Sequence, residues 1–171
     1  VEFGNCISGV EVTNGFYEDF GTGVTSSTTP YTSYTYNPIS VYVGGEYVIG
    51  NNANTYQVNF VNAPDHTGNP DGKMLIVNAN ATPDIFYQRT ISVIPNVSLR
   101  FDYYIKNAIS TTFVGLGFAD PNVRAQIETT SGTVLGFVDT GNIPIDNTWY
   151  NQVAVINPGN NSSIVVKLLN N

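Results

Sequence analysis

The sequence predicts an all-β protein, a single β-sandwich of two antiparallel sheets with about ten strands over residues 1–171. Three observations support this prediction. Short segments alternate apolar and polar residues with a period of two, as in half-buried strands. Gly, Pro and Asn turn signals separate these segments at regular spacing. No window of useful length shows the 3.6-residue period of a helix.

Short strands and strong turn signals make up the first half of the chain. Residues 1–12 hold one or two strands, and Asn14-Gly15 is a turn signal. Residues 22–40, rich in Thr, Ser, Tyr and Pro, predict a long loop with one edge strand. The further strands expected here are the hairpin Val41–Val43 and Tyr47–Ile49, then Thr55–Val61, then Met74–Val77. The consecutive apolar residues of the last strand predict burial on both of its faces.

The second half shows the clearest alternation, at Ser98–Lys106. Leu99 and Phe101 would point inward from this strand, and Arg100 and Asp102 outward. The other strands expected here are Ile85–Val93, Phe113–Phe118, Val123–Glu128, Val134–Val138, Trp149–Ile156 and Ser163–Leu169.

Composition excludes some functions and favours others. The chain has a net charge of −7 and six basic residues, which disfavours nucleic acid and anionic membrane surfaces as partners. No apolar run is long enough for membrane insertion. Only 11% of residues are charged, and this favours a loop-rich extracellular or cell-surface domain. Because the chain starts at Val1, we expect it to be a processed or excised part of a longer protein.

One stretch combines turn residues with oxygen donors. The Asp65 loop, residues 65–72, carries Asp65, Thr67, Asn69 and Asp71. Oxygen ligands suit calcium, and clustered carboxylates repel one another unless they are separated or neutralised by a bound ion. The loop does not have the EF-hand pattern. A plain Asx-turn loop without an ion is the alternative.

Two single residues can be interpreted as either structural or functional. Cys6 reads as a small buried hydrophobe near the first strand, because a nucleophile would need a base. The only histidine, His66, reads as a hydrogen-bonding residue more readily than as a metal ligand or base.

Several segments resemble known families. The segment Asn14-Gly15-Phe16-Tyr17-Glu18-Asp19 resembles the opening of galactose-binding-like jelly rolls. Asp65-His66-Thr67-Gly68, followed by Gly72 to Val77, resembles a segment of MAM domains. The continuation, through 85–90, 101–107 and 147–152, is similar to jelly-roll modules of large bacterial surface adhesins and secreted carbohydrate-active proteins.

This resemblance implies a jelly-roll fold and a structural calcium. The implied ligands are Glu18 and Asp65, with Thr67 as a further candidate. The oxygen donors of the loop itself add Asp71 as a candidate ligand. The acidic closing strand of these families is missing after Leu169. Either residues 1–12 supply that pairing, or an edge is left open for another segment, such as a strand from a neighbouring module or subunit.

Outward polar and aromatic side chains are the candidates for ligand contact. On the strand Ser98–Lys106 and a neighbouring one, the candidates are Tyr104, Arg100, Asp102, Arg124 and Gln126. In the long loop they are Tyr34 and Tyr36. A solvated sheet face and a surface cover layer are the alternative interpretations. Trp149 fits either sugar stacking or packing at the start of a strand.

The sequence favours a non-catalytic module that binds a glycan or cell-surface polysaccharide and holds a structural calcium. The alternative is a structural subunit or repeat of a surface adhesin or filament, joined by strand complementation. A hydrolase is not expected, because nothing marks the pair of carboxylates that a glycosidase needs.

Overall fold

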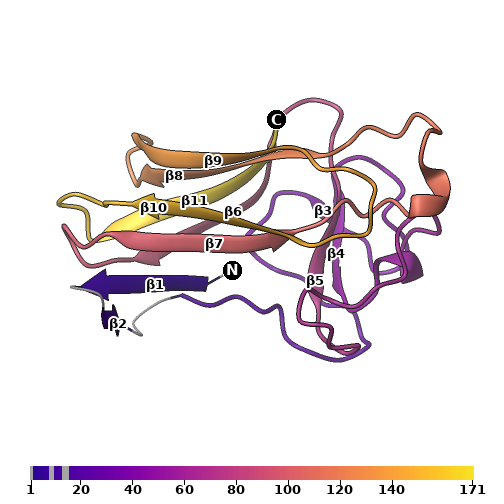
Figure 1. Cartoon of the computed structure of the whole chain (residues 1–171), viewed down its shortest axis with the longest axis horizontal. Coiled ribbons are helices and arrows are strands. Elements are labelled where there is room, and N and C mark those ends of the chain that lie inside the picture. Colours follow the sequence, from indigo (N-terminus) through magenta and orange to yellow (C-terminus); the bar gives the residue numbers. More distant parts are fainter. Residues whose placement is uncertain (1, 8–9, 13–15) are drawn as a thin grey trace.

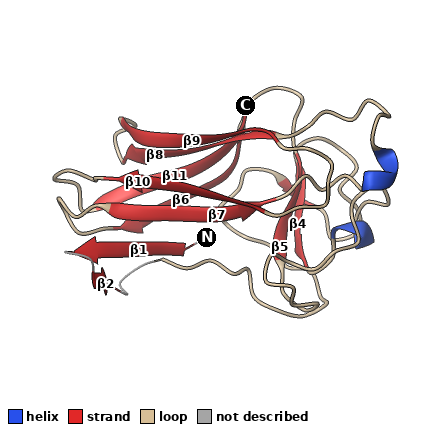
Figure 2. Ribbon diagram, viewed as in Figure 1, coloured by secondary structure: helices blue, strands red, loops and turns tan. Residues whose placement is uncertain are grey.

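The computed structural model describes the backbone of residues 2–7 and 10–12 and the whole of residues 16–171. Within these ranges the regular structure is almost entirely strand, with two short 3-10 helices at one end of the molecule (Figure 2). The expected all-β class is therefore confirmed. None of the described helices is long and apolar enough to cross a membrane.

Two antiparallel sheets form the sandwich (Figure 1). The first sheet has the order β10 (Tyr150–Ile156), β7 (Leu99–Ile105), β1 (Glu2–Ile7) and β2 (Val10–Val12). The second sheet has the order β6 (Ile85–Ser92), β11 (Ser163–Asn170), β8 (Asn122–Thr129) and β9 (Val134–Asn142).

The connections between these strands are those of a jelly roll. From β6 to β8, and again from β9 to β11, consecutive strands switch between the two sheets, and β8 and β9 form a hairpin. One edge of β7 pairs with β1, with Phe3 opposite Phe101. Residues from the start of the chain therefore supply the closing pairing.

A third, small sheet departs from the expected two. It has the order β3 (Thr35–Tyr36), β4 (Glu46–Gly50) and β5 (Met74–Asn78), and β4 and β5 run across one end of the sandwich (Figure 1). Leu75 and Val77 of β5 contact the core of the sandwich, whereas Met74 and Ile76 contact a second apolar cluster. The expected burial of this strand on both faces is confirmed.

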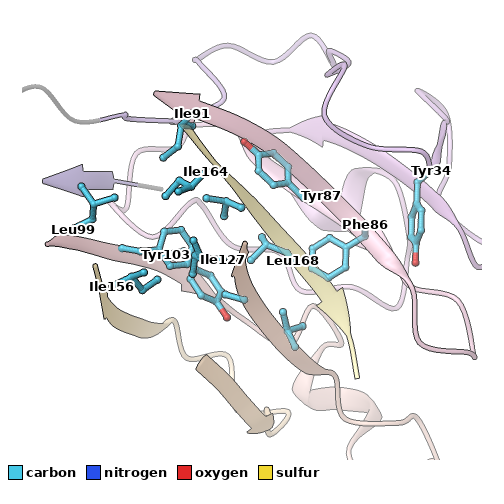
Figure 3. Packing of buried hydrophobic residues seen from close by; sticks show 14 of the residues in the cluster. Tyr34, Phe86, Tyr87, Ile91, Leu99, Tyr103, Ile127, Ile156, Ile164 and Leu168 are labelled. Atoms are coloured by element: carbon cyan, nitrogen blue, oxygen red, sulfur yellow. The ribbon is translucent and has the colours of Figure 1, made fainter. Parts of the chain in front are cut away.

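The main core fills the space between the two large sheets (Figure 3). On β7, Leu99, Phe101 and Tyr103 point inward, as the alternation predicts. They meet inward residues of the second sheet, among them Ile127 and Ile164 (Figure 3). The second cluster lies beyond the third sheet and consists of Val41, Val48, Ala53, Tyr56, Phe60 and Ile76.

Three segments that were predicted as strands have a different structure. Val41–Val43 is instead a turn, in which the Glu46 carboxylate accepts a hydrogen bond from the Val43 amide at 2.9 Å. The region of Thr55–Val61 starts with the 3-10 helix η1 (Ala53–Thr55) and continues through turns. Its start is set by Asn52, whose side chain caps this helix.

The third wrong strand is Phe113–Phe118. The segment begins with the 3-10 helix η2 (Thr111–Phe113) and continues as a turn. Gly115 and Gly117 both have positive φ, at 80° and 85°, a conformation that excludes a regular strand. Two other sequence-based predictions, the turn at Asn14-Gly15 and the environment of the Cys6 side chain, concern parts of the chain outside the described residues.

A mutation in the core tests the packing directly. The Tyr103 hydroxyl is buried and has no hydrogen-bond partner among the described residues, and burial raises the pKa of this phenol. Because an unpaired buried hydroxyl is destabilising, we expect Tyr103→Phe to raise the free energy of unfolding by about 1 kcal/mol in urea denaturation.

The matched control is Tyr47→Phe, since Tyr47 is equally buried but its hydroxyl pairs with Thr28 Oγ1 at 2.5 Å and donates to the Thr29 carbonyl at 3.1 Å. We expect Tyr47→Phe to lower the free energy of unfolding by about 1 kcal/mol, because it removes these hydrogen bonds. An equal loss of stability in both variants would contradict the described environment of Tyr103.

Candidate functional site

Aromatic rings from three distant segments meet at the end of β7. The His66 ring, from the Asp65 loop, stacks on Tyr104 with centroids 4.1 Å apart and an interplanar angle of 15°. Trp149 lies edge-on to His66 at 6.3 Å. The Lys106 ammonium lies 5.3 Å from the centroid of the Trp149 ring. We call His66, Tyr104 and Trp149 the aromatic platform.

Tyr104 and Trp149 of the platform line a cleft of about 690 Å³ between β5 and the segment 104–109. Apolar residues of both clusters form much of its wall, including Ile76, Phe60 and Val123. Exposed aromatic side chains lie along it, and these are Tyr42, Tyr104 and Phe118. The charged side chains that line the cleft are Lys106 and Asp120. Apolar walls with a few polar groups are typical of ligand pockets.

The elements beneath the platform fix its position. Tyr104 is in β7 opposite Asn151 of β10, and Trp149 directly precedes β10. Continued by one residue, this register places Trp149 opposite Lys106. Because Tyr104 is in β7, and Lys106 and Trp149 directly flank two paired strands, these side chains are held closer to a fixed geometry than residues of a long loop would be.

A buried asparagine holds the chain that follows Lys106. Asn107 is 2% exposed, and its Nδ2 donates to the Ile143 carbonyl at 2.9 Å and to Asp120 at 3.4 Å. Its Oδ1 accepts from the Ile109 amide at 3.0 Å. These bonds join both ends of the 107–120 connection at the cleft wall, so Asn107 is a structural residue of the site.

The Asp65 loop is stabilised by its own side chains. Asp65 Oδ1 accepts hydrogen bonds from the Thr67 amide at 3.0 Å, from Thr67 Oγ1 at 2.7 Å and from the Asn69 amide at 3.2 Å. A Cβ atom on Gly72 would collide with the Asp65 carboxylate, so a larger residue at that position would displace this side chain from its hydrogen bonds. These bonds are those of the Asx-turn alternative, and they present His66 to Tyr104.

Residues 21–23, which follow Glu18 in the sequence, lie beside residues 71–73 at the end of the Asp65 loop. The Gly23 amide donates to the Asp71 carbonyl at 2.7 Å, and the Lys73 amide donates to the Gly21 carbonyl at 3.0 Å. Glu18 itself forms an ion pair with Arg89 at 2.8 Å. In the described part of the chain, no group of three or more His, Cys, Asp or Glu side chains is placed to hold a metal ion.

The ligand-contact residues expected on strands divide between the two faces of the molecule. Arg100, Asp102 and Tyr104 lie on the outer face of β7, where Arg100 and Asp102 pair at 2.8 Å. Arg124 and Gln126 are on β8, which belongs to the second sheet. The prediction that these two groups lie on neighbouring strands is therefore wrong. The connection from β7 to β8 crosses from the first sheet to the second.

The other predicted ligand-contact residues lie away from the cleft, and their polar groups already form hydrogen bonds or ion pairs within the protein. Arg124 forms a two-bond ion pair with Asp139 at 2.7 and 2.8 Å, and Gln126 donates to Glu128 at 2.5 Å. Tyr34 is 7% exposed and its hydroxyl donates to Asp84. The Tyr36 hydroxyl pairs with Ser26 Oγ at 2.9 Å. We therefore restrict the candidate site to the platform and the cleft.

Burial lowers the pKa values of two residues at the site. Burial lowers the pKa of His66 below its ordinary value, although Asp65 opposes this, so the ring is neutral at pH 7. Burial likewise lowers the pKa of Lys106, against the opposing charge of Asp146.

Of the platform residues, the sequence predicted Tyr104 as a ligand contact, whereas His66 and Trp149 were considered one at a time and not as members of a common site. The outward alternation of Tyr104 and Lys106 was the one available signal.

Comparison with known proteins gives no relative. No family model, curated protein or solved structure matches the chain. The resemblance to galactose-binding-like and MAM-like modules stays a prediction, and the site has to be interpreted from its own geometry.

Proposed function

We propose that this protein is a non-catalytic carbohydrate-binding module whose ligand lies along the cleft and stacks on the aromatic platform. The observation that carries the proposal is the position of Tyr104 and Trp149 at the edge of a cleft of about 690 Å³. The apolar face of a sugar ring packs on an aromatic ring, and short polar side chains hydrogen-bond its hydroxyl groups.

The cleft supplies both kinds of contact. Tyr104 is 48% exposed, so one side of the ring packs on His66 while a large part remains accessible. Asn80 and Asn122 also line the cleft, and the buried Asn122 Oδ1 has no hydrogen-bond partner among the described residues. Because Tyr104 is fixed in β7, less conformational entropy is lost when a ligand stacks on its ring.

The proposal is binding and not hydrolysis. Glycosidases place two carboxylates on either side of the scissile bond. Asp120 is the carboxylate side chain among the described residues that line this cleft, and it accepts a hydrogen bond from Asn107. We assign Asp120 to hydrogen bonding with sugar hydroxyl groups.

The partner in this proposal is a glycan or cell-surface polysaccharide, and the place of action is outside the cell. The low charge content of the chain is the support for that location. The alternative of a filament or adhesin subunit joined by strand complementation would use the edge of β7. Because β1 of the same chain pairs with that edge, we do not adopt this alternative.

A structural calcium ion at the Asp65 loop is also a proposal. It is supported by the oxygen-rich composition of the loop and by the backbone bonds that bring residues 21–23 against residues 71–73. Differential scanning fluorimetry with millimolar calcium, or with a chelator, tests it. Calcium at about 100 times its Kd would stabilise the fold by about 2.7 kcal/mol and raise Tm.

The control is Asp65→Asn, in which the calcium-dependent rise in Tm should disappear. The same Tm in calcium and in chelator for the wild-type protein would contradict the calcium proposal. It would leave carbohydrate binding untouched, because the platform residues are not among the proposed ligands.

Glycan binding is tested by truncating the accessible ring of the platform. We expect Tyr104→Ala to weaken binding about tenfold or more, since the stacking surface is lost. The measurement is isothermal titration calorimetry with a polysaccharide selected on a glycan array. Phe137→Ala is the matched control: Phe137 is 54% exposed but lies on β9 of the second sheet, and its loss should leave binding unchanged. No glycan bound by the wild-type protein, or equal effects of the two variants, would contradict the proposed function.

A further inference from the structure

Lys106 differs from the other basic residues of the chain. The chain has six Lys and Arg residues, and five of them have a polar partner. These pairs are Lys73 with Ser27, Arg89 with Glu18, Arg100 with Asp102, Arg124 with Asp139, and Lys167 with Glu128. Among the described residues, no side chain or carbonyl accepts a hydrogen bond from Lys106, and no carboxylate is within ion-pair distance of it.

The surroundings of Lys106 do not resemble those of an ordinary solvated lysine. Its side chain is half-buried in the cleft wall, and its ammonium lies 5.3 Å from the centroid of the Trp149 ring. The nearby Asp146 is engaged elsewhere, by the Tyr150 hydroxyl at 2.6 Å and the Thr148 amide at 2.9 Å. A partly desolvated ammonium that lacks an acceptor has most to gain from an anion that enters the cleft.

We propose that the ligand of the cleft is an acidic glycan, and that Lys106 binds the carboxylate of a uronic acid residue stacked on the aromatic platform. This inference rests on the proposed function and adds the class of sugar. A pyranose ring packed on Tyr104 or Trp149 directs its C5 substituent past the edge of the aromatic ring. When that substituent is a carboxylate, an ammonium placed over the same platform can pair with it.

The overall charge of the protein does not favour an acidic ligand. The net charge is −7, so the long-range field of the protein repels a polyanion. At about 0.15 M salt the screening length is about 8 Å, and distant charges contribute little. A preference for an acidic oligosaccharide would therefore arise at close range from Lys106. Asp120, the other charged side chain of the cleft, is hydrogen-bonded to Asn107 and would oppose a carboxylate at its own position.

The test compares each acidic ligand with its uncharged methyl ester. Oligogalacturonate, oligomannuronate and oligoglucuronate are each titrated beside their methyl esters, by calorimetry and by the fluorescence of Trp149, the only tryptophan. We expect at least one of the acids to bind about tenfold more tightly than its ester. In Lys106→Gln this preference should vanish while the ester binds as it does to wild type.

Lys73→Gln is the matched control, because Lys73 is also half-buried but contacts Ser27 away from the cleft, and this variant should keep the preference. Circular dichroism establishes that both variants fold. Equal affinity for the acid and its ester would overturn this inference, and so would a preference for the acid that survives in Lys106→Gln. Either result would leave the proposed function standing. Binding of sulfated oligosaccharides alone would overturn the assignment of the carboxylate. If neither these oligosaccharides nor any neutral glycan bound, both proposals would be wrong.

Discussion

The structure depends on one small sheet that is apolar on both faces. Side chains of β5 alternate between two hydrophobic clusters, with Leu75 and Val77 toward the sandwich and Met74 and Ile76 away from it. A strand of this kind has to be covered on both sides, because each exposed apolar face would lose its hydrophobic stabilisation. The sandwich covers one side, and the second cluster covers the other.

This requirement explains where the candidate site lies. The second cluster is completed by Ala108 and Ile109, which follow β7, so the chain between β7 and β8 passes across the end of the sandwich. Backbone bonds from Val61 to Ala108 and from Ser110 to Asn59 hold it there. The cleft is the space left between this passage and β5. The platform stands at its edge because β7 ends where the passage begins.

The sequence was a good guide to the sandwich and a poor guide to the site. Alternation identified β7 and β8 correctly, since an apolar face buried against a core leaves a period of two. It failed at Thr55–Val61 and Phe113–Phe118, where similar patterns occur. There, the capping side chain of Asn52 and the positive φ of Gly115 override the pattern.

The site was harder to predict because its residues come together only through the fold. His66 and Trp149 are 83 positions apart in the sequence and both border Tyr104 or its neighbour Lys106. No local pattern encodes such a contact. The division of Arg124 from Tyr104 is equally non-local, because it follows from which sheet receives each consecutive strand.

Chemical-shift mapping by NMR tests the account most directly, since Trp149 provides a single indole N–H signal at the platform. On titration with the oligouronate that binds most tightly, we expect this signal and the amide signals of residues 76–80 and 104–109 to shift together and to saturate. Signals from the outer face of β8 and β9 should not move. Shifts confined to that opposite face, or an indole signal that does not respond while other parts of the chain bind the ligand, would contradict it.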